Sequence, residues 1–504
     1  MKNLLKPLSL ALFVAATLPT QNACNQTSPS SDTIPATSPS PPFCKAIGGE
    51  KFDVGVSLIQ TSDSGYAIAG FTISFGAGEA DVYVVKLDAN GNLQWTKTIG
   101  GPGNEAGNSL IQTSDGGYAI AGTTTSFGAG EADVYVVKLD ATGNLQWTKT
   151  IGGLGYDGGS SLIQTSDGGY AITGLTQSFG TGEDDVYVVK LDVNGNLQWN
   201  RTIGGKKEDW GSLLIQTSDG GYAIAGTTTS FGAGEADIYL VKLDGNGNLQ
   251  WTRTIGGPKS DEGYSLIQTS DGGYAIAGDT KSFGAGEADV YVVKLDASGN
   301  LQWTKTIGGP ASEEGNSLIQ TADGGYAIAG STKSFGAGRE DVYVVKLDAN
   351  GNLQWTKTIG GPKGDEGYSL IQTSDGGYAI TGESSSFGAG KADVYVIKLD
   401  ANGNLQWTKT IGGPDSEEGV YLIQTSDGGY AIAGYTESFG AGGKDVYVIK
   451  LDKNGDACCA VSQTSQVGAG GTLSSPISSI GSGGTLSSPI PSTSSGGTLT
   501  TLCP

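Results

Sequence analysis

Short runs rich in apolar and β-branched residues occupy most of the chain, and each run ends at turn residues such as glycine, asparagine, aspartate or serine. In the outermost run of each unit, such as 93–99, apolar and polar residues alternate. In the first complete unit these runs are Ser57–Thr61, Tyr66–Gly70, Val82–Asp88 and Leu93–Ile99. They are rich in Val, Ile, Tyr, Thr and Trp, which favour strands, and no helical period interrupts them. The pattern therefore predicts an all-β protein.

Two of the connections within each unit are predicted to be tight hairpin turns. Residues 62–65 read Ser-Asp-Ser-Gly, and residues 89–92 read Ala-Asn-Gly-Asn. Glycine and asparagine tolerate the positive φ that such turns require. The connection around Phe-Gly-Ala-Gly at 75–78 is longer.

The unit repeats every 52 residues along the chain. Seven tryptophans mark the interval: Trp95, Trp147, Trp199, Trp251, Trp303, Trp355 and Trp407. A repeat of this length indicates a solenoid, a propeller or an array. Four antiparallel strands in about 50 residues, repeated eight times, predict a single eight-bladed β-propeller.

The two ends of the repeat region are predicted to close the ring together. The eighth unit has three strands and ends at 451–458 without a tryptophan strand. Residues 43–49, Phe-Cys-Lys-Ala-Ile-Gly-Gly, align with the tryptophan strand at 95–101. The N-terminal strand is therefore predicted to complete the last blade of a propeller at 43–459, because an open array would leave unpaired edges.

The flanks of the propeller indicate export. Residues 1–24 have the charge and apolar run of a signal peptide. Cys24 follows a small residue, as in bacterial lipoproteins, so lipidation at Cys24 and free secretion are alternatives. Residues 25–42 are predicted to be a Ser/Thr/Pro-rich disordered linker, and 460–504 a Gly/Ser/Thr-rich low-complexity tail. The expected location is extracellular or at the cell-envelope surface.

The composition excludes several classes of function. The chain has no histidine, which excludes hydrolases, zinc sites and proton relays that depend on imidazole. A net charge of −22 repels phosphate backbones, so nucleic acid is not an expected partner. The sequence contains no nucleophile elbow, P-loop or CxxC motif. We expect no enzymatic activity and no cofactor.

Two resemblances place the repeat among known propellers. The sequence KLDANGNLQW at 86–95 resembles the tryptophan-docking motif of eight-bladed quinoprotein dehydrogenases and related outer-membrane assembly lipoproteins, with a spacing from Asp to Trp that is one residue shorter. Over 43–458 the whole unit more closely resembles the Gly-rich TSDGGY propeller repeats of prokaryotic secreted and surface proteins. That second resemblance implies the fold and no established activity.

Quinone-dependent catalysis does not follow from the first resemblance. Quinoproteins place calcium and an aspartate base at one point over the ring, so one blade must break the pattern, and here the copies barely differ. Cys458 and Cys459 resemble the adjacent cysteines of those enzymes, but they replace strand residues where the ring closes. We therefore assign them to closure.

Each unit carries acids at four positions, represented by Asp53, Asp63, Asp81 and Asp88. Asp63 and Asp88 are predicted to accept backbone N–H groups within their own turns. Calcium is the alternative, because residues 88–92 begin like a calcium loop; their glycine stands at the fourth position and no glutamate follows at the twelfth.

The acids equivalent to Asp53 are expected to form a ring on one set of loops. They either tie these loops to neighbouring blades, which we favour, or bind cations together. The ring consists of Asp53, Glu105, Asp157, Asp209, Asp261, Glu313, Asp365 and Glu417.

The five cysteines predict disulfide closure. An odd number leaves one over in an exported protein, and lipidation of Cys24 would account for it. We expect Cys44 to bond one of Cys458 and Cys459, and Cys503 to bond the other.

Differences among the eight copies indicate where a ligand binds. The tight turns hardly change, whereas substitutions gather after each Gly-Gly pair and around Phe-Gly-Ala-Gly, on connections predicted to share one face. Drift among duplicated units is the alternative explanation. Exposed aromatic residues amid acids suit sugars or proteins. The predicted ligand contacts are Phe52, Phe71, Tyr156, Trp210, Tyr264, Tyr421 and Tyr435.

The sequence thus predicts an exported, non-enzymatic binding propeller. Its partner is expected to be a surface glycan, bound multivalently by similar blades, or a protein. A structural surface or filament subunit and an envelope-assembly scaffold lipoprotein are the alternatives. Membrane attachment is expected only through a lipid at Cys24.

Overall fold

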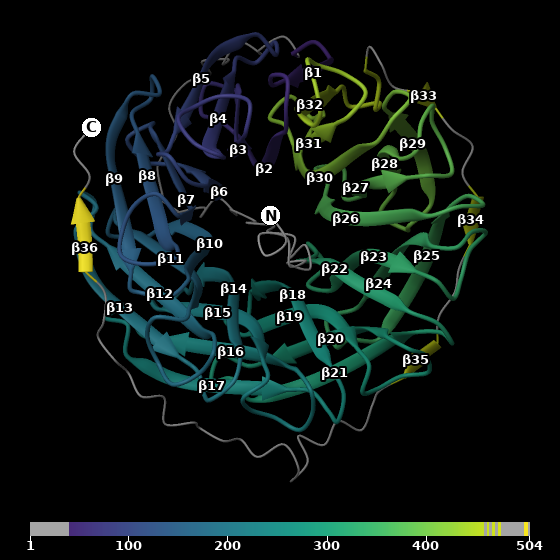
Figure 1. The fold of residues 1–504 in the computed structure, drawn as a ribbon. Helices are drawn as coiled ribbons and strands as arrows, with labels where there is room; N and C mark the ends of the chain where they lie inside the picture. The colour runs from purple at the N-terminus through teal and green to yellow at the C-terminus, as the bar shows by residue number, and fades with distance from the viewer. Residues whose placement is uncertain (1–39, 458–460, 463–465, 469–471, 475–497, 502–504) are drawn as a thin grey trace, which may run out of the picture.

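Eight antiparallel sheets, each with four strands from the repeat region, radiate from a central axis in the computed structural model, which describes residues 40–457, 461–462, 466–468, 472–474 and 498–501 (Figure 1). The described residues form strands and turns and contain no helix, so none that could span a membrane. The predicted all-β, eight-bladed propeller is confirmed.

Each blade runs from strand A at the centre to strand D at the rim (Figure 1). The A strands of blades 1 to 8 are β2 (Asp53–Gln60), β6 (Glu105–Gln112), β10 (Asp157–Gln164), β14 (Asp209–Gln216), β18 (Asp261–Gln268), β22 (Glu313–Gln320), β26 (Asp365–Gln372) and β30 (Glu417–Gln424). The B strands are β3 (Tyr66–Thr72), β7 (Tyr118–Thr124), β11 (Tyr170–Thr176), β15 (Tyr222–Thr228), β19 (Tyr274–Thr280), β23 (Tyr326–Thr332), β27 (Tyr378–Ser384) and β31 (Tyr430–Thr436).

The two outer strands follow the same order. The C strands are β4 (Asp81–Leu87), β8 (Asp133–Leu139), β12 (Asp185–Leu191), β16 (Asp237–Leu243), β20 (Asp289–Leu295), β24 (Asp341–Leu347), β28 (Asp393–Leu399) and β32 (Asp445–Leu451). The D strands are β5 (Leu93–Ile99), β9 (Leu145–Gly152), β13 (Leu197–Ile203), β17 (Leu249–Ile255), β21 (Leu301–Gly308), β25 (Leu353–Gly360), β29 (Leu405–Ile411) and, in blade 8, β1 (Phe43–Ile47).

Strands A and B are longer than the sequence pattern predicts. Strand β2 begins at Asp53, four residues before the predicted start, because the prediction rests on the repeated run at 57–61. The residues before it vary between copies and contain a bulge between Gly55 and Ser57. Strand β3 continues to Thr72, past the predicted end at Gly70. Both extensions lie at the end of the blade that carries the longer connections.

The ring closes as predicted, by exchange between the two ends of the repeat region. Strand β1 pairs antiparallel with β32 from Phe43 opposite Lys450 to Ile47 opposite Val446. The ring of Phe43 lies edge-on to Tyr66 of blade 1, with 5.8 Å between the ring centroids. It therefore replaces the tryptophan that the other seven blades use.

The hydrophobic core lies between neighbouring blades. In a typical interface Ala119, Val136 and Ile151 of blade 2 pack with Tyr170 and Val189 of blade 3. Such clusters repeat around the ring, so each blade is stabilised mainly by the next one.

The repeated tryptophan docks onto the next blade. Trp147 of blade 2 meets Tyr170 of blade 3 edge-on, at 5.7 Å between centroids. Gly195, in the C–D turn of blade 3, has φ of 76°, and a Cβ there would press on the indole of Trp147. Glycine is required for both reasons. The turn and the tryptophan thus form one docking unit, as the resemblance to tryptophan-docking propellers implies.

Four short strands from the C-terminal tail extend the outer edges of blades. They are β33 (Val461–Ser462) on β29, β34 (Gln466–Gly468) on β25, β35 (Thr472–Ser474) on β21 and β36 (Thr498–Thr501) on β9. Figure 1 shows them on the rim of the disc. Pairing at these positions covers strand edges that would otherwise be open.

Candidate functional site

The connections of the blades open on two opposite faces of the disc. The loop face carries the B–C loops, such as 73–80, and the crossovers from strand D to the next strand A, such as 100–104. These lie side by side, since Ala80 and Asn104 form a parallel bridge and Glu79 N donates to Gly103 O. The prediction that the two variable connections share a face is confirmed. The turn face carries the A–B and C–D turns.

The turn face uses its carboxylates internally. Asp63 Oδ1 accepts a hydrogen bond from Gly65 N at 3.0 Å. Asp88 Oδ1 accepts from Asn90 N at 2.9 Å and from Asn92 N at 2.8 Å. The predicted role of these acids within their turns is confirmed, and little of their hydrogen-bonding capacity is left for a partner.

A buried lysine reinforces each A–B turn, which sequence reasoning missed. Lys242 is 2% exposed, and its Nζ donates to Asp219 Oδ1 at 3.1 Å and to Leu243 O at 2.9 Å. Burial raises the pKa of Asp219, but hydrogen bonds from Thr217 and Lys242 outweigh it and lower that pKa to about 2. The signal in the sequence is the lysine within the apolar run DVYVVKLD and its variants.

The ring of acids equivalent to Asp53 lies on strands, not on loops as expected. Asp157, for example, is the first residue of β10 and is fully buried. Its Oδ2 accepts hydrogen bonds from Gly153 N and Ser178 Oγ, both at 2.6 Å, and its N donates to Ala132 O of the preceding blade at 2.7 Å. The tying role is confirmed, although the acids act from inside the blades.

Each acid of this ring lies next to the first residue of strand C in the preceding blade, and we call the two a seam pair. A Cβ on Gly256 would overlap both Asp237 Oδ1 and Asp261 Oδ2. Asp237 Oδ1 is buried without a hydrogen-bond partner. Burial, with the nearby charge of Asp261, raises the pKa of Asp237 to about 6. The seam pairs therefore place two buried acids together between blades.

The seven aromatic residues predicted as ligand contacts occupy different environments. Phe52 and Tyr156 lie in crossovers on the loop face. The other five lie on strands, so assigning them to loops was wrong. They are Phe71 on β3, Trp210 on β14, Tyr264 on β18, Tyr421 on β30 and Tyr435 on β31. Four of them lie where strands A and B extend further than predicted, and Tyr421 lies at the first position of the predicted run itself.

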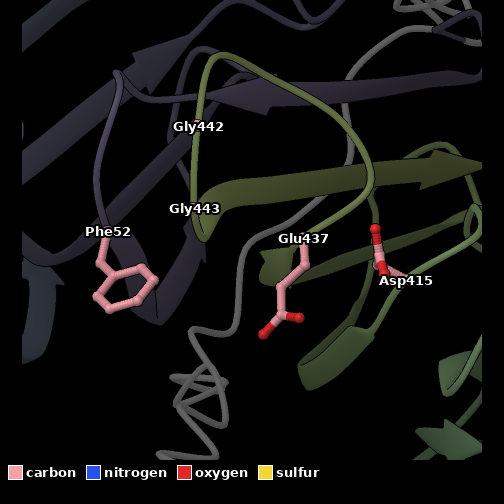
Figure 2. Close-up of a pocket in the computed structure, with 5 residues that line it drawn as sticks. All are labelled: Phe52, Asp415, Glu437, Gly442 and Gly443. Atoms are coloured by element: carbon pink, nitrogen blue, oxygen red, sulfur yellow. The ribbon is translucent and has the colours of Figure 1, made fainter.

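Two of these residues are exposed on the loop face. Trp210 is 38% exposed, and its Nε1 donates to Asp184 Oδ2 of the preceding blade at 2.8 Å, which fixes the indole. Phe52 is 49% exposed and borders a hollow of about 360 Å³. Figure 2 shows this hollow beside Asp415, Glu437 and the backbone at 442–443, where blade 8 meets blade 1.

The remaining aromatic residues serve packing or polar networks. Tyr421 packs against the core cluster between blades 8 and 1. Tyr156 is half-buried, and burial raises the pKa of its hydroxyl. Phe71 is half-buried opposite Val54. Tyr264 and Tyr435 contact acids that the sequence analysis did not single out.

The loop-face ends of strands A and B divide the ring into two unlike halves. In blades 5 to 8 the opposed residues are Glu262 and Asp279, Glu314 and Ser331, Glu366 and Glu383, and Glu418 and Tyr435. In blades 1 to 4 they are Val54 and Phe71, Ala106 and Thr123, Gly158 and Leu175, and Trp210 and Thr227. Ser331 Oγ also donates to Glu340 at 2.8 Å. We call the following residues the acidic arc: Glu262, Asp279, Glu314, Glu340, Glu366, Glu383 and Glu418.

The acids of the arc are electrostatically coupled. Burial and then the charge of Glu340 raise the pKa of Glu366 to about 7, and burial and then the charge of Glu418 raise the pKa of Glu383 to about 7. Tyr368 donates to Glu366 Oε2 at 3.2 Å. The available sequence signal was the glutamate that precedes the glycine of strand A in four consecutive copies.

Several predicted features lie outside the described residues. These are the signal peptide with Cys24, and Cys458, Cys459 and Cys503. Cys44 lies on β1, and its side chain packs against the same core cluster as Ala457, the residue before Cys458. This places the two chain segments near each other, and the pairing of the cysteines stays a prediction.

No cluster of three or more Cys, Asp or Glu side chains suited to a metal ion occurs within the part of the chain that the structure describes. In the calcium-like segment 88–92, Asp88 Oδ2 also accepts from Asn92 Nδ2 at 2.9 Å. Hydrogen bonds of the turn thus engage both oxygens of that carboxylate. Calcium binding stays an untested alternative.

Comparison with known proteins agrees with the fold. Residues 83–281 and 284–439 match the family model described as outer membrane protein assembly factor BamB. The regulatory protein FlaEY of Caulobacter vibrioides is 25% identical over 426 residues, which are 77% of this chain and 42% of FlaEY. Sqt1 of Chaetomium thermophilum is 13% identical, with 82% of this chain and 99% of Sqt1 covered at a TM-score of 0.50. The Neurospora crassa Pan2 WD40 domain covers 68% of this chain and 88% of its own, with 13% identity and a TM-score of 0.40. The likeness to Sqt1 shows the fold alone.

Proposed function

Because the chain belongs to the family described as outer membrane protein assembly factor BamB, we propose that it is an exported, non-enzymatic interaction propeller that binds a protein partner through its loop face. The observation that carries this proposal is the difference between the two faces. The turn face repeats nearly the same bonded turns eight times, whereas on the loop face the ends of strands A and B are acidic in blades 5 to 8 and mostly apolar in blades 1 to 4.

The same difference favours a protein over eight equal sugar sites. Multivalent binding of one sugar requires equivalent pockets on several blades. The B–C loops keep Ser-Phe-Gly-x-Gly in every copy, whereas the crossovers and the loop-face ends of strands A and B change from blade to blade. A single asymmetric surface suits a partner that contacts several blades at once.

Two exposed aromatic side chains supply anchors for such a partner. Trp210 is held by Asp184, so little side-chain entropy would be lost on binding. Phe52 stands beside the hollow at the closing seam. Aromatic residues of this kind carry much of the binding energy in protein interfaces.

An envelope-assembly scaffold is the second candidate, favoured by the family match. In that case the partner would be another component of the envelope. FlaEY is named a regulatory protein, and the match spans 42% of its length. From this match we therefore propose only that the chain binds a partner, and not that it has a regulatory role. A surface or filament subunit stays an alternative.

Site-specific photo-crosslinking in the producing cells tests the proposal. A photoreactive phenylalanine analogue would replace Phe52 or Trp210 on the loop face, and Val193, which is 55% exposed in a turn, as the control. We expect protein adducts from the first two positions and none from the third. Adducts from Val193 alone, or equal yields from all three, would overturn the assignment. A glycan array with the purified protein tests the alternative that the ligand is a sugar.

A further inference from the structure

The acidic arc holds more negative charge than the chain around it neutralises. Seven acids face three lysines of the B–C loops: Lys281, Lys333 and Lys444. Among the ion pairs of the described residues, the arc contributes one, between Glu340 Oε2 and Lys333 Nζ at 3.7 Å. The arc therefore keeps an excess of acids over bases.

The fold itself does not require these acids. Glu262 stands directly opposite Asp279, and Glu366 directly opposite Glu383, and like charges across a strand pair are destabilising. Partial burial increases that cost. Blades 1 to 4 fill the same positions with apolar or small residues and keep the same strand pairing. The cost is thus confined to half of the ring.

One oxygen within the arc lacks any donor. Asp279 is 6% exposed, and its Oδ1 has no hydrogen-bond partner. Its charged and polar neighbours are Tyr264, Glu262, Glu314 and Lys281. The Asp279 carboxyl is hydrogen-bonded to Tyr264, and leaving its other oxygen buried without a donor is costly.

One end of the arc already holds a cation. Lys444 Nζ lies 3.6 Å from the ring centroid of Tyr435, whose hydroxyl is hydrogen-bonded to Glu418. Blades 5 and 7 repeat the tyrosine–glutamate pair, with Tyr264 and Tyr368 donating to the glutamates two residues before them. None of the cation–ring contacts found within the described ranges involves these two tyrosines.

We propose that the acidic arc is the docking site of a lysine- or arginine-rich segment of a protein partner, whose cations lie between tyrosine rings and carboxylates in blades 5 and 7. The inference rests on the proposed function of the loop face. An aromatic ring beside a carboxylate is the environment that ammonium and guanidinium groups prefer. The span of the arc over four blades suits a chain of cations better than a single ion.

Calorimetric titration of the full chain with a ten-residue oligolysine peptide tests this proposal. The double variant Glu366→Gln/Glu383→Gln removes two arc charges, and Glu131→Gln/Glu235→Gln removes two exposed charges from B–C loops of the other half. We expect at least tenfold weaker binding for the arc variant and less than a twofold change for the control variant. Equal losses in both would mean attraction to net charge alone and would overturn the proposal.

Proton release supplies a second readout on the unmodified protein. Because the pKa values of Glu366, Glu383 and Asp279 lie near 7, a bound cation should displace protons from them at pH 7. The observed heat should therefore depend on the ionisation enthalpy of the buffer. Binding without proton release would show that the peptide binds elsewhere, and would refute the proposal that the acidic arc is its docking site.

Parallel titrations identify the ligand class. Tight binding of calcium chloride or spermine, with weak binding of oligolysine, would replace the peptide by an ion or a free polyamine and overturn the proposal. Crosslinks from Phe52 and Trp210 to a partner that lacks a basic segment would do the same. That last result would leave the proposed function of the loop face intact.

Discussion

Replacing Asp237 by asparagine should make the propeller more stable above pH 6. Asp237 Oδ2 accepts a hydrogen bond from Ala233 N at 3.0 Å, and its Oδ1 lies without a partner next to Asp261. An asparagine can keep the first bond through its oxygen and donate from its nitrogen to Asp261. The change removes a buried charge and fills an unsatisfied position at once.

The size of the effect follows from the raised pKa. The pKa of Asp237 is about 6 in the folded protein, against 3.8 for an unperturbed aspartate, and this difference corresponds to roughly 3 kcal/mol. Between pH 4 and pH 6 the unfolded chain loses this proton before the folded chain does, so wild-type stability falls as the pH rises. The Asp237→Asn variant lacks this loss. Its advantage should therefore grow from pH 4 to pH 6 and stay constant above.

Thermal unfolding followed by circular dichroism at pH 4, 6 and 8 measures this difference. Asp244→Asn, in the C–D turn of the same blade, is the matched control, and we expect it to change the stability in the opposite direction. Burial of Asp244 raises its pKa, but hydrogen bonds from Asn248 and Asn246 outweigh burial and lower it overall, so the ionised carboxylate stabilises the wild type above its unfolded pKa. This variant should therefore be less stable than the wild type by a nearly constant amount at pH 4, 6 and 8. Equal midpoints for wild type and Asp237→Asn at pH 8, or a penalty at every pH, would refute the account of the seam pairs.

Three further predictions concern closure, the turns and the cysteines. Deleting residues 1–49 removes β1 and opens the edge of β32, so we expect aggregation or a clearly lower melting temperature; a monomer that melts like the wild type would contradict the closure. Asp219→Ala leaves buried Lys242 without its carboxylate and should cost roughly 1–3 kcal/mol by denaturant unfolding, and no loss would show that water replaces the pair. Peptide mapping under oxidising conditions should find Cys44 bonded within 458–459, and a free Cys44 thiol would disprove that pairing.

The sequence determined the architecture because its signals are periodic. The interval between tryptophans, the copy number and the alignment of Phe43 with Trp95 together predicted eight blades and the exchanged strand. The boundaries of the strands were harder to predict from the sequence. The first residues of strand A contain a glycine and a bulge and vary from copy to copy, so they resembled a loop.

The candidate functional surface could be predicted only in part from the sequence. Comparing the eight copies with one another identified the variable face. That comparison selected the aromatic residues as ligand contacts and did not include the glutamates of strand A. Whether Glu366 meets Glu383 depends on strand register, which the pattern alone did not give. The tail strands β33 to β36 were also missed, because backbone pairing at an edge needs few distinctive side chains.

Hydroxyl-radical footprinting of the protein in its producing cells, compared with the purified protein, tests the central claim most directly. It requires no knowledge of the partner. Phe52 and Trp210 on the loop face, and Leu93 and Val193 at the turn face, are all exposed in the free protein. The account predicts that labelling of Phe52 and Trp210 falls in cells while that of Leu93 and Val193 is unchanged. Protection of the turn-face residues alone, or equal labelling of all four in both states, would contradict it.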